Sequence, residues 1–393
     1  MCNEPNDVSL FMDNITDDYN SSGLPQRPVY YLNITNIMPI KFAQVLNGYI
    51  MPFLLVITII ANTLILVVLS KRHMRTPTNI VLMAMALADM FTLLIPSPWL
   101  FYAYTFGNHA EPLYPLAACY TFKLMHEVLP NLFHTASIWL TLALAVQRYI
   151  YVCHPAMART WCTVTGINKA IFWIFLFATV HQSTQPFVSQ YSSHQIIWNG
   201  QSVHVCKEEF SPWLCFVTPN VYFNLYYWFR VICVHVLPCV ILVILNVLLF
   251  AAMKRAQKKR QRLFKDKKKK NECRKLRDSN MTTLMLIVVV TVFLCVEIPL
   301  GVVTILHIIN NSMFEVLNYD IAQALILFTN FFIIVSYPIN FAIYCGMSRQ
   351  FRETFQELFL NGPTALQRNG SSKYTIVNTH PPGPHASMQE TNL

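Results

Sequence analysis

The sequence carries little charge. Asp, Glu, Lys and Arg make up only 12% of its 393 residues, whereas a soluble domain usually carries about twice that share. It also contains no HExxH, GxSxG or GxxxxGKS/T motif, the signatures of metalloproteases, serine hydrolases and P-loop enzymes. No internal repeat of the solenoid or propeller kind is visible. These absences argue against a soluble domain, an enzyme and a repeat protein.

Apolar residues, by contrast, make up 54% of the chain. They gather in seven continuous runs, each about 20 residues or longer, and such a run crosses a bilayer as a helix. A helix satisfies its own backbone hydrogen bonds where lipid offers no water, whereas β-barrel spans would be shorter and would alternate. We therefore expect an all-α membrane protein with a seven-transmembrane helix bundle over residues 45–346, its helices lying near 49–70, 79–101, 117–152, 167–187, 222–253, 282–309 and 321–344.

The basic residues predict the orientation of these spans. Of the 29 Lys and Arg, 23 fall in the loops 71–76, 153–169 and 254–280 and in the tail after residue 344. The positive-inside rule then places the N-terminus outside and the C-terminus inside the cell. Residues 1–40 are polar and acidic, so we expect no cleavable signal peptide and a first span that acts as its own insertion signal. The predicted location is the plasma membrane.

The two tails and the third inner loop fit this topology. The extracellular tail 1–44 contains glycosylation acceptors at Asn14, Asn20 and Asn33.

The basic run 254–277 holds 14 Lys and Arg. It is a short loop between two spans, which disfavours nucleic acid as a partner; anionic lipid headgroups and a docking protein remain compatible readings. The cytoplasmic tail 361–393 ends in Thr391-Asn-Leu393, which could bind a PDZ domain.

Cysteine counting leaves the disulfides open. Cys2, Cys119, Cys206 and Cys215 would face the oxidising side, where disulfides persist. Four cysteines allow three complete pairings.

A set of residues at specific places in the spans resembles the rhodopsin-like G-protein-coupled receptors. Gln147-Arg148-Tyr149 at the inner end of the third span is similar to the family's Asp-Arg-Tyr, and an arginine inside a span is costly unless it is functional or reaches the interface. The matching residues elsewhere are Asn62, Asp89, Phe293, Pro238, Pro299 and the stretch from Asn340 to Tyr344, followed by an amphipathic eighth helix at 347–360.

Longer stretches narrow the resemblance to the insect receptors for sex peptide and myoinhibitory (allatostatin B type) peptides. They include YTFGNH, MARTWCT and YPINFAIYCGMSRQFRETF. The resemblance implies a secreted, amidated, tryptophan-containing peptide as ligand, a heterotrimeric G protein of the inhibitory class as partner, and arrestin as a further partner. It also implies a role of Gln147, Arg148, Tyr149, Phe293, Pro299, Asn340 and Tyr344 in activation, and a Cys119–Cys206 disulfide with Cys215 as the competitor.

The chain departs from the family pattern at several positions. Gln147 replaces the usual Asp, so Arg148 lacks its neighbouring carboxylate. Phe341 replaces a proline, and Pro338 lies three residues earlier. Asn246 and Glu297 stand where a Tyr and a Trp are usual, and Cys119 lies about one helical turn further than usual from Arg148.

Ionisable residues inside the spans are expensive and mark candidate sites. Asp89 is expected near the midplane, with Asn62 and Asn340 as partners, either as a structural polar knot or with a sodium ion; no other cofactor or metal is expected. The candidate ligand-binding residues lie in the outer halves of the spans: His126, Glu127, Arg230, Glu297 and His307. We expect Glu297 and Arg230 to be close enough to pair, either as a static salt bridge or as a pair for which an amidated peptide terminus competes.

Other functions remain as alternatives. A receptor for a different neuropeptide, of the myosuppressin or FMRFamide type, is the nearest one. A transporter would show broken helices in related halves, which the sequence does not display. A seven-helix odorant-receptor channel would have its N-terminus inside, against the distribution of basic loops.

Overall fold

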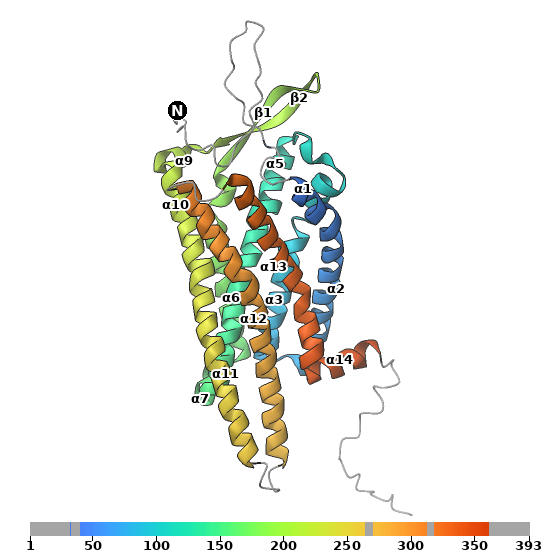
Figure 1. The fold of residues 1–393 in the computed structure, drawn as a ribbon, viewed down its shortest axis with the longest axis vertical. Helices are drawn as coiled ribbons and strands as arrows, with labels where there is room; N and C mark the ends of the chain where they lie inside the picture. Colours follow the sequence, from blue (N-terminus) through green and yellow to red (C-terminus); the bar gives the residue numbers. More distant parts are fainter. Residues whose placement is uncertain (1–31, 33–39, 264–269, 313–317, 361–393) are drawn as a thin grey trace, which may run out of the picture.

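Seven long helices stand side by side in the computed structural model, which describes residues 32, 40–263, 270–312 and 318–360 (Figure 1). Within this part of the chain, seven helical segments are long and apolar enough to cross a membrane. They are numbered here as spans one to seven: Ile40–Leu69, Pro77–Thr105, Leu116–Cys153, Val164–Phe187, Pro219–Lys258, Thr283–Asn310 and Ile321–Met347. The predicted all-α, seven-helix fold is therefore confirmed.

Most spans are built from more than one helical segment. Span one consists of α1 (Ile40–Ala43), η1 (Gln44–Ile50) and α2 (Met51–Leu69). Span two consists of α3 (Pro77–Leu94), α4 (Ser97–Leu100) and η3 (Phe101–Thr105). Span three consists of α5 (Leu116–Phe122), η5 (Lys123–Val128) and α6 (Leu129–Cys153). Span four consists of α8 (Val164–Gln182) and η6 (Gln185–Phe187), and span five of α10 (Pro219–Phe229), η7 (Arg230–Val236) and part of α11 (Leu237–Leu263). Spans six and seven are parts of α12 (Lys270–Ser312) and α13 (Tyr319–Met347).

Shorter elements connect the spans. The inner side carries η2 (Arg72–Met74), α7 (Pro155–Trp161) and the eighth helix α14 (Arg349–Phe359), and the outer side carries η4 (Asn108–Ala110), β1 (Ser189–Trp198), β2 (Gln201–Phe210) and α9 (Pro212–Val217).

Three of the spans contain a π-helical turn that ends two residues before a proline. The segments η1, η5 and η7 end just before Pro52, Pro130 and Pro238. A proline has no N–H to donate, and its ring clashes with the carbonyl four residues earlier. The wider turn is a local answer to that clash. In span three this wider turn lies between Cys119 and Arg148, the interval in which the sequence departs from the family pattern, and it takes up extra residues within the helix.

A β-hairpin covers the outer end of the bundle and was not predicted from the sequence. Strands β1 and β2 pair antiparallel from Ser189↔Phe210 to Trp198↔Gln201. Asn199 and Gly200 both have positive φ values, 49° and 79°, which suits a two-residue turn. The Cys119–Cys206 disulfide attaches β2 to the outer end of span three, as expected. Cys215 is disulfide-bonded as well and therefore does not compete for Cys119.

The inner half of the bundle holds the largest hydrophobic core. It joins spans one to four, six and seven to α14, which turns away from α13 at the inner end of the bundle (Figure 1). Ser348 caps α14 by accepting a hydrogen bond from the Phe351 N–H at 3.2 Å. Phe341 of span seven packs against the rings of Phe351 and Phe355, with centroids 6.0 Å apart in each case. The departure from proline at Phe341 thus gives α14 an aromatic anchor, and Pro338 lies inside the helix instead.

Candidate functional site

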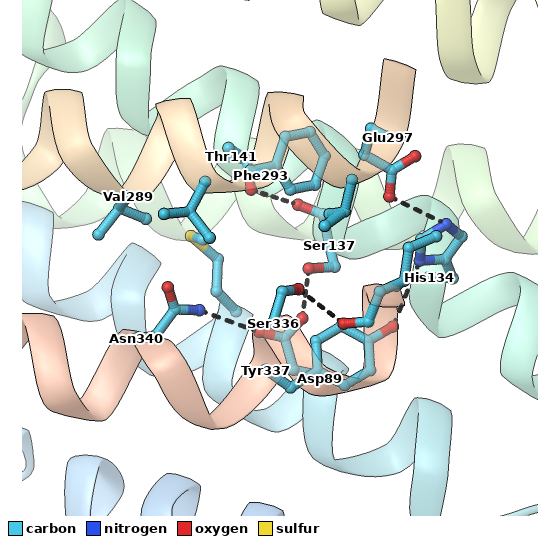
Figure 2. A pocket seen from close by; sticks show the side chains of 14 residues that line it. Asp89, His134, Ser137, Thr141, Val289, Phe293, Glu297, Ser336, Tyr337 and Asn340 are labelled. Atoms are coloured by element: carbon cyan, nitrogen blue, oxygen red, sulfur yellow. Dashed lines mark hydrogen bonds and ion pairs between the residues drawn. The ribbon is translucent and has the colours of Figure 1, made fainter. Parts of the chain in front are cut away.

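A buried acid, Glu297, lies beside the His134 ring in the interior of the bundle (Figure 2). The Glu297 side chain on α12 is 1% exposed. Its Oε1 lies 3.2 Å from Nε2 of His134 on α6, and its Oε2 lies 3.3 Å from Nδ1 of His235 on η7. The Tyr337 hydroxyl on α13 lies 3.5 Å from the other nitrogen of His134. The cluster therefore ties together spans three, five, six and seven.

The expected pair between Glu297 and Arg230 is not formed. The Arg230 guanidinium on η7 instead donates to Oδ1 of Asn131 on α6 at 2.7 Å. His235, five residues further along the same span, occupies the place beside Glu297. A buried carboxylate needs a close polar partner. His235, which like Arg230 lies in the π-turn η7, supplies that partner with a shorter side chain than Arg230.

A second buried acid, Asp89 on α3, lies nearer the inner end of the bundle than the Glu297 cluster. Its Oδ1 accepts a hydrogen bond from the Ser137 hydroxyl at 2.5 Å, and its Oδ2 accepts one from the Asn340 amide at 3.5 Å. Asn340 is thus a partner as expected, whereas Asn62 donates to the Thr58 carbonyl of its own helix at 3.1 Å. Because that bond directs the Asn62 amide to its own helix, the second hydrogen bond to Asp89 comes from Ser137.

Asp89 and Glu297 face one common cavity of about 20 Å³ between spans two, three, six and seven (Figure 2). A space of that size holds one water-sized species. Phe293, one of the expected activation residues, lines its inner side together with Thr141 and Val289.

The outer half of span three carries a charged group that reaches the hairpin. Lys123 Nζ lies 2.8 Å from the carboxylate of Glu127 and 4.0 Å from that of Glu208 on β2. The Tyr191 hydroxyl on β1 donates to the Glu208 carboxylate at 3.3 Å. Burial and the neighbouring Glu208 raise the pKa of Tyr191, so its hydroxyl stays protonated as the donor. The hairpin is thereby held over span three by charge as well as by the disulfide.

Asn131 links two of the expected ligand-binding residues. Its amide donates to the backbone carbonyl of Glu127 at 2.7 Å while its Oδ1 accepts from Arg230. Glu127 keeps 40% of its side chain exposed. His126 stacks on Phe122 with ring centroids 4.8 Å apart, and His307 is half-buried on span six. The five expected residues therefore do not converge on one point: Glu127 and Arg230 lie around Asn131, and Glu297 lies beneath them.

Aromatic rings line spans four and five beside Arg230. His181 on α8 stacks on Tyr226 of α10 at 5.1 Å and on Phe229 at 5.5 Å. Tyr222 stacks on Tyr226 at 6.1 Å, one helical turn away. His181 is therefore part of a group of aromatic rings in the outer half of the bundle.

Of the expected activation residues, Gln147, Arg148, Tyr149 and Tyr344 lie at the inner end. Arg148 and Tyr149 are half-buried on α6, and Tyr344 is buried in the inner core of α13. Tyr149 packs between spans three, five and six and has the His154 ring 5.6 Å away. Pro299 lies inside α12, two residues after Glu297. Asn246, in place of a Tyr, donates to the Thr291 hydroxyl at 3.0 Å and so joins spans five and six.

Sequence reasoning missed His134, His235, Lys123 and Glu208 as site residues. Polar residues within an apolar run were the available signal, but a histidine in a span has no motif that identifies its partner. The structure supplies that partner through contacts between spans.

The chain has clear relatives among known proteins. A family model described as the serpentine type 7TM GPCR chemoreceptor Srw matches residues 49–362. The sex peptide receptor of Drosophila melanogaster is 54% identical, over 89% of this chain and 80% of that receptor. The sex peptide receptor-related protein 2 of Caenorhabditis elegans is 35% identical, over 82% of this chain and 73% of that protein. The FMRFamide receptor of Drosophila melanogaster is 27% identical, over 77% of this chain and 52% of that receptor.

Proposed function

Because the chain belongs to the seven-transmembrane G-protein-coupled receptors, a family of receptors and not of enzymes, we propose that it binds a secreted peptide at the outer end of the bundle and activates an inhibitory G protein at the inner end. The observation that carries the ligand class is the 54% identity with the sex peptide receptor over most of both chains. The proposed ligand is an amidated, tryptophan-containing peptide of the sex peptide or myoinhibitory type. In this proposal the N-terminus is extracellular.

The outer residues offer chemistry that suits such a peptide. Glu127 presents a half-exposed carboxylate that can accept two N–H bonds from a terminal amide. Arg230 presents a guanidinium that donates to the neutral side chain of Asn131 and has further N–H groups that can donate to peptide carbonyls. The rings of His181, Tyr222 and Tyr226 provide flat faces for tryptophan side chains. His126 and His307 complete the proposed contact set.

Glu297 takes a different role in this proposal. Its carboxylate is buried against the imidazoles of His134 and His235. A bound peptide would therefore contact this cluster from the outer side of the bundle and would not replace a partner of Glu297. A ligand that favours one packing of spans three, five and six shifts the population toward it. His134 and His235 are the contacts through which such a shift would reach Glu297.

The residues around Asp89 fit a sodium ion. Hard cations take oxygen ligands, and the Asp89 carboxylate and the Ser137 hydroxyl face a cavity of suitable size. Two buried acids on one cavity also favour a bound positive charge. Asp89 and Ser137 would hold the ion, with the Asn340 side-chain oxygen as a further ligand.

A receptor for FMRFamide-like peptides is the second candidate, since a receptor with that name is 27% identical. A channel or transporter is not retained, because the family consists of receptors.

A peptide panel on cells that express the full chain tests the proposal. Amidated tryptophan-containing peptides and FMRFamide-like peptides are compared, each with its free-acid form, and activation of inhibitory and stimulatory G proteins is measured. Arg148→Ala at matched surface expression serves as the signalling control. A response only to FMRFamide-like peptides would favour the second candidate, and glycosylation at Asn14 or Asn33 would establish the orientation.

A further inference from the structure

The Arg148 side chain is not restrained by its neighbour in the sequence. Its Nε is buried and has no hydrogen-bond partner among the described residues. Gln147 is 2% exposed, and neither its amide oxygen nor its amide nitrogen has a partner there. In the described part of the chain, no acidic side chain forms an ion pair with Arg148. Gln147 therefore does not form the ion pair with Arg148 that a carboxylate at this position would form.

A tyrosine one helical turn further along contacts the guanidinium instead. Cζ of Arg148 lies 5.9 Å from the centroid of the Tyr151 ring. Residues three apart on a helix lie on the same face, and a guanidinium near an aromatic face is attracted by the ring quadrupole. Arginine is well suited to this contact because its planar group is weakly hydrated.

The Tyr151 ring is itself fixed by the second inner loop. Its hydroxyl donates to the backbone carbonyl of Cys162 at 3.1 Å. Cys162 directly follows α7, is buried, and donates its own N–H to the Ala158 carbonyl at 3.1 Å. The hydrogen bond therefore joins the end of span three to the end of α7.

The turn between α7 and α8 is tightly built. A Cβ added to Gly166 would lie 2.7 Å from the Trp161 carbonyl oxygen. Thr163 caps α8 by accepting a hydrogen bond from the Gly166 N–H at 3.1 Å. The close approach at Gly166 and the cap at Thr163 hold the Cys162 carbonyl in place, and through it the Tyr151 ring.

We propose that Tyr151 is the positioning residue that restrains Arg148 in this receptor, in place of the missing carboxylate. The Tyr151 ring holds the guanidinium, and the bond to Cys162 ties that restraint to α7. A G protein that engages Arg148 competes with the ring, so loss of the ring increases the fraction of receptors with a free guanidinium. The inference rests on the proposed G-protein activation by Arg148.

The test measures basal and peptide-stimulated G-protein recruitment by the full chain at matched surface expression. Tyr151→Leu removes both the ring and the hydroxyl, and we expect basal recruitment to rise about two- to fivefold, the ratio that corresponds to an exposed cation–π contact. Tyr151→Phe keeps the ring and loses only the bond to Cys162, so its rise should be smaller. Ile150→Leu, on the adjacent half-buried residue, is the matched control and should leave basal recruitment unchanged.

A rescue separates a restraint on Arg148 from general damage to the loop. Gln147→Asp supplies a carboxylate beside Arg148, and in the Tyr151→Leu background it should return basal recruitment to the wild-type level. Unchanged basal recruitment in Tyr151→Leu would overturn the inference, as would a rise that Gln147→Asp fails to reverse.

Basal recruitment needs no ligand, so a wrong peptide assignment affects only the stimulated measurements. If Arg148→Ala recruits G protein normally, the proposed role of Arg148 fails. If Arg148→Ala abolishes recruitment while Tyr151→Leu behaves as wild type, only the inference about Tyr151 fails.

Discussion

Glu297 Oε1 lies 3.2 Å from His134 Nε2 in the interior of the bundle. The contact joins span six to span three, at a depth where a lone carboxylate would be costly. His235 approaches the second oxygen of Glu297 from span five. A single acid thus fixes the mutual positions of three spans whose relative movement is the expected route from ligand to G protein.

Removing that acid should destabilise the receptor. We expect Glu297→Leu to lose about 3 kcal/mol, because two buried imidazoles are then left without their partner. Glu297→Gln should lose about 1 kcal/mol, since its carbonyl can still accept one N–H bond. The measurement is the thermal unfolding midpoint of the detergent-purified receptor. Thr304→Val is the control, because the Thr304 hydroxyl donates to the Leu300 carbonyl of its own helix. Equal midpoints for all variants would contradict the role of Glu297.

Glu127 should determine the preference for an amidated ligand. Its half-exposed carboxylate can accept the two N–H donors of a terminal amide and repels a terminal carboxylate. We expect Glu127→Gln to reduce the preference for amidated over free-acid peptide by roughly tenfold, the size of a hydrogen bond to a charged group. Competition binding with both peptide forms measures this ratio. Glu127→Gln also breaks the ion pair between Glu127 and Lys123. Lys123→Gln breaks the same ion pair but keeps the Glu127 carboxylate, so this control variant should still prefer the amidated peptide.

Arg148 should be required for signalling and dispensable for ligand binding. It lies at the inner end of span three, far from the outer residues in the same span such as Glu127. We expect Arg148→Ala to abolish G-protein activation while peptide affinity changes less than about threefold, corresponding to roughly 0.6 kcal/mol. Radioligand binding and G-protein activation on the same cells measure the two effects. Normal activation by a normally expressed variant would remove Arg148 from the proposed mechanism.

Phe341 should anchor the eighth helix. Its ring packs against Phe351 and Phe355 of α14, so Phe341→Ala leaves a gap between α13 and α14. We expect a loss of about 2 kcal/mol, less than for a fully buried ring, seen as a lower thermal midpoint and faster proteolysis of α14. Phe332→Ala, on an outward-facing ring that is 55% exposed, should have a much smaller effect. Equal losses in the two variants would mean that the contact with α14 adds nothing specific.

Much of the architecture could be predicted from the sequence. Seven spans follow from apolar run length, because a chain in lipid must satisfy its backbone within each helix. The bounds of the spans were less predictable: span one begins at Ile40 rather than near 49, since a helix can continue beyond its apolar core into the interface. The hairpin β1–β2 was not predicted, because its polar and apolar residues show no clear alternation and its position depends on a disulfide to span three.

The candidate site divides in the same way. The sequence by itself determined that Asp89, Arg148, Arg230 and Glu297 lie inside spans, and the position of each along its span, because hydropathy and helical rise are local properties. Tertiary structure alone decided the partners of three of them: Ser137 for Asp89, Asn131 for Arg230, and two histidines for Glu297. Tyr151 is a neighbour of Arg148 on the same helix, and tertiary structure decided only its hydrogen bond to Cys162. His235 and Glu297 are 62 residues apart in the chain, and no local pattern encodes such a contact. It arises from the rotation of each helix about its axis, which is set by the packing of all its neighbours and by the π-turns before Pro130 and Pro238.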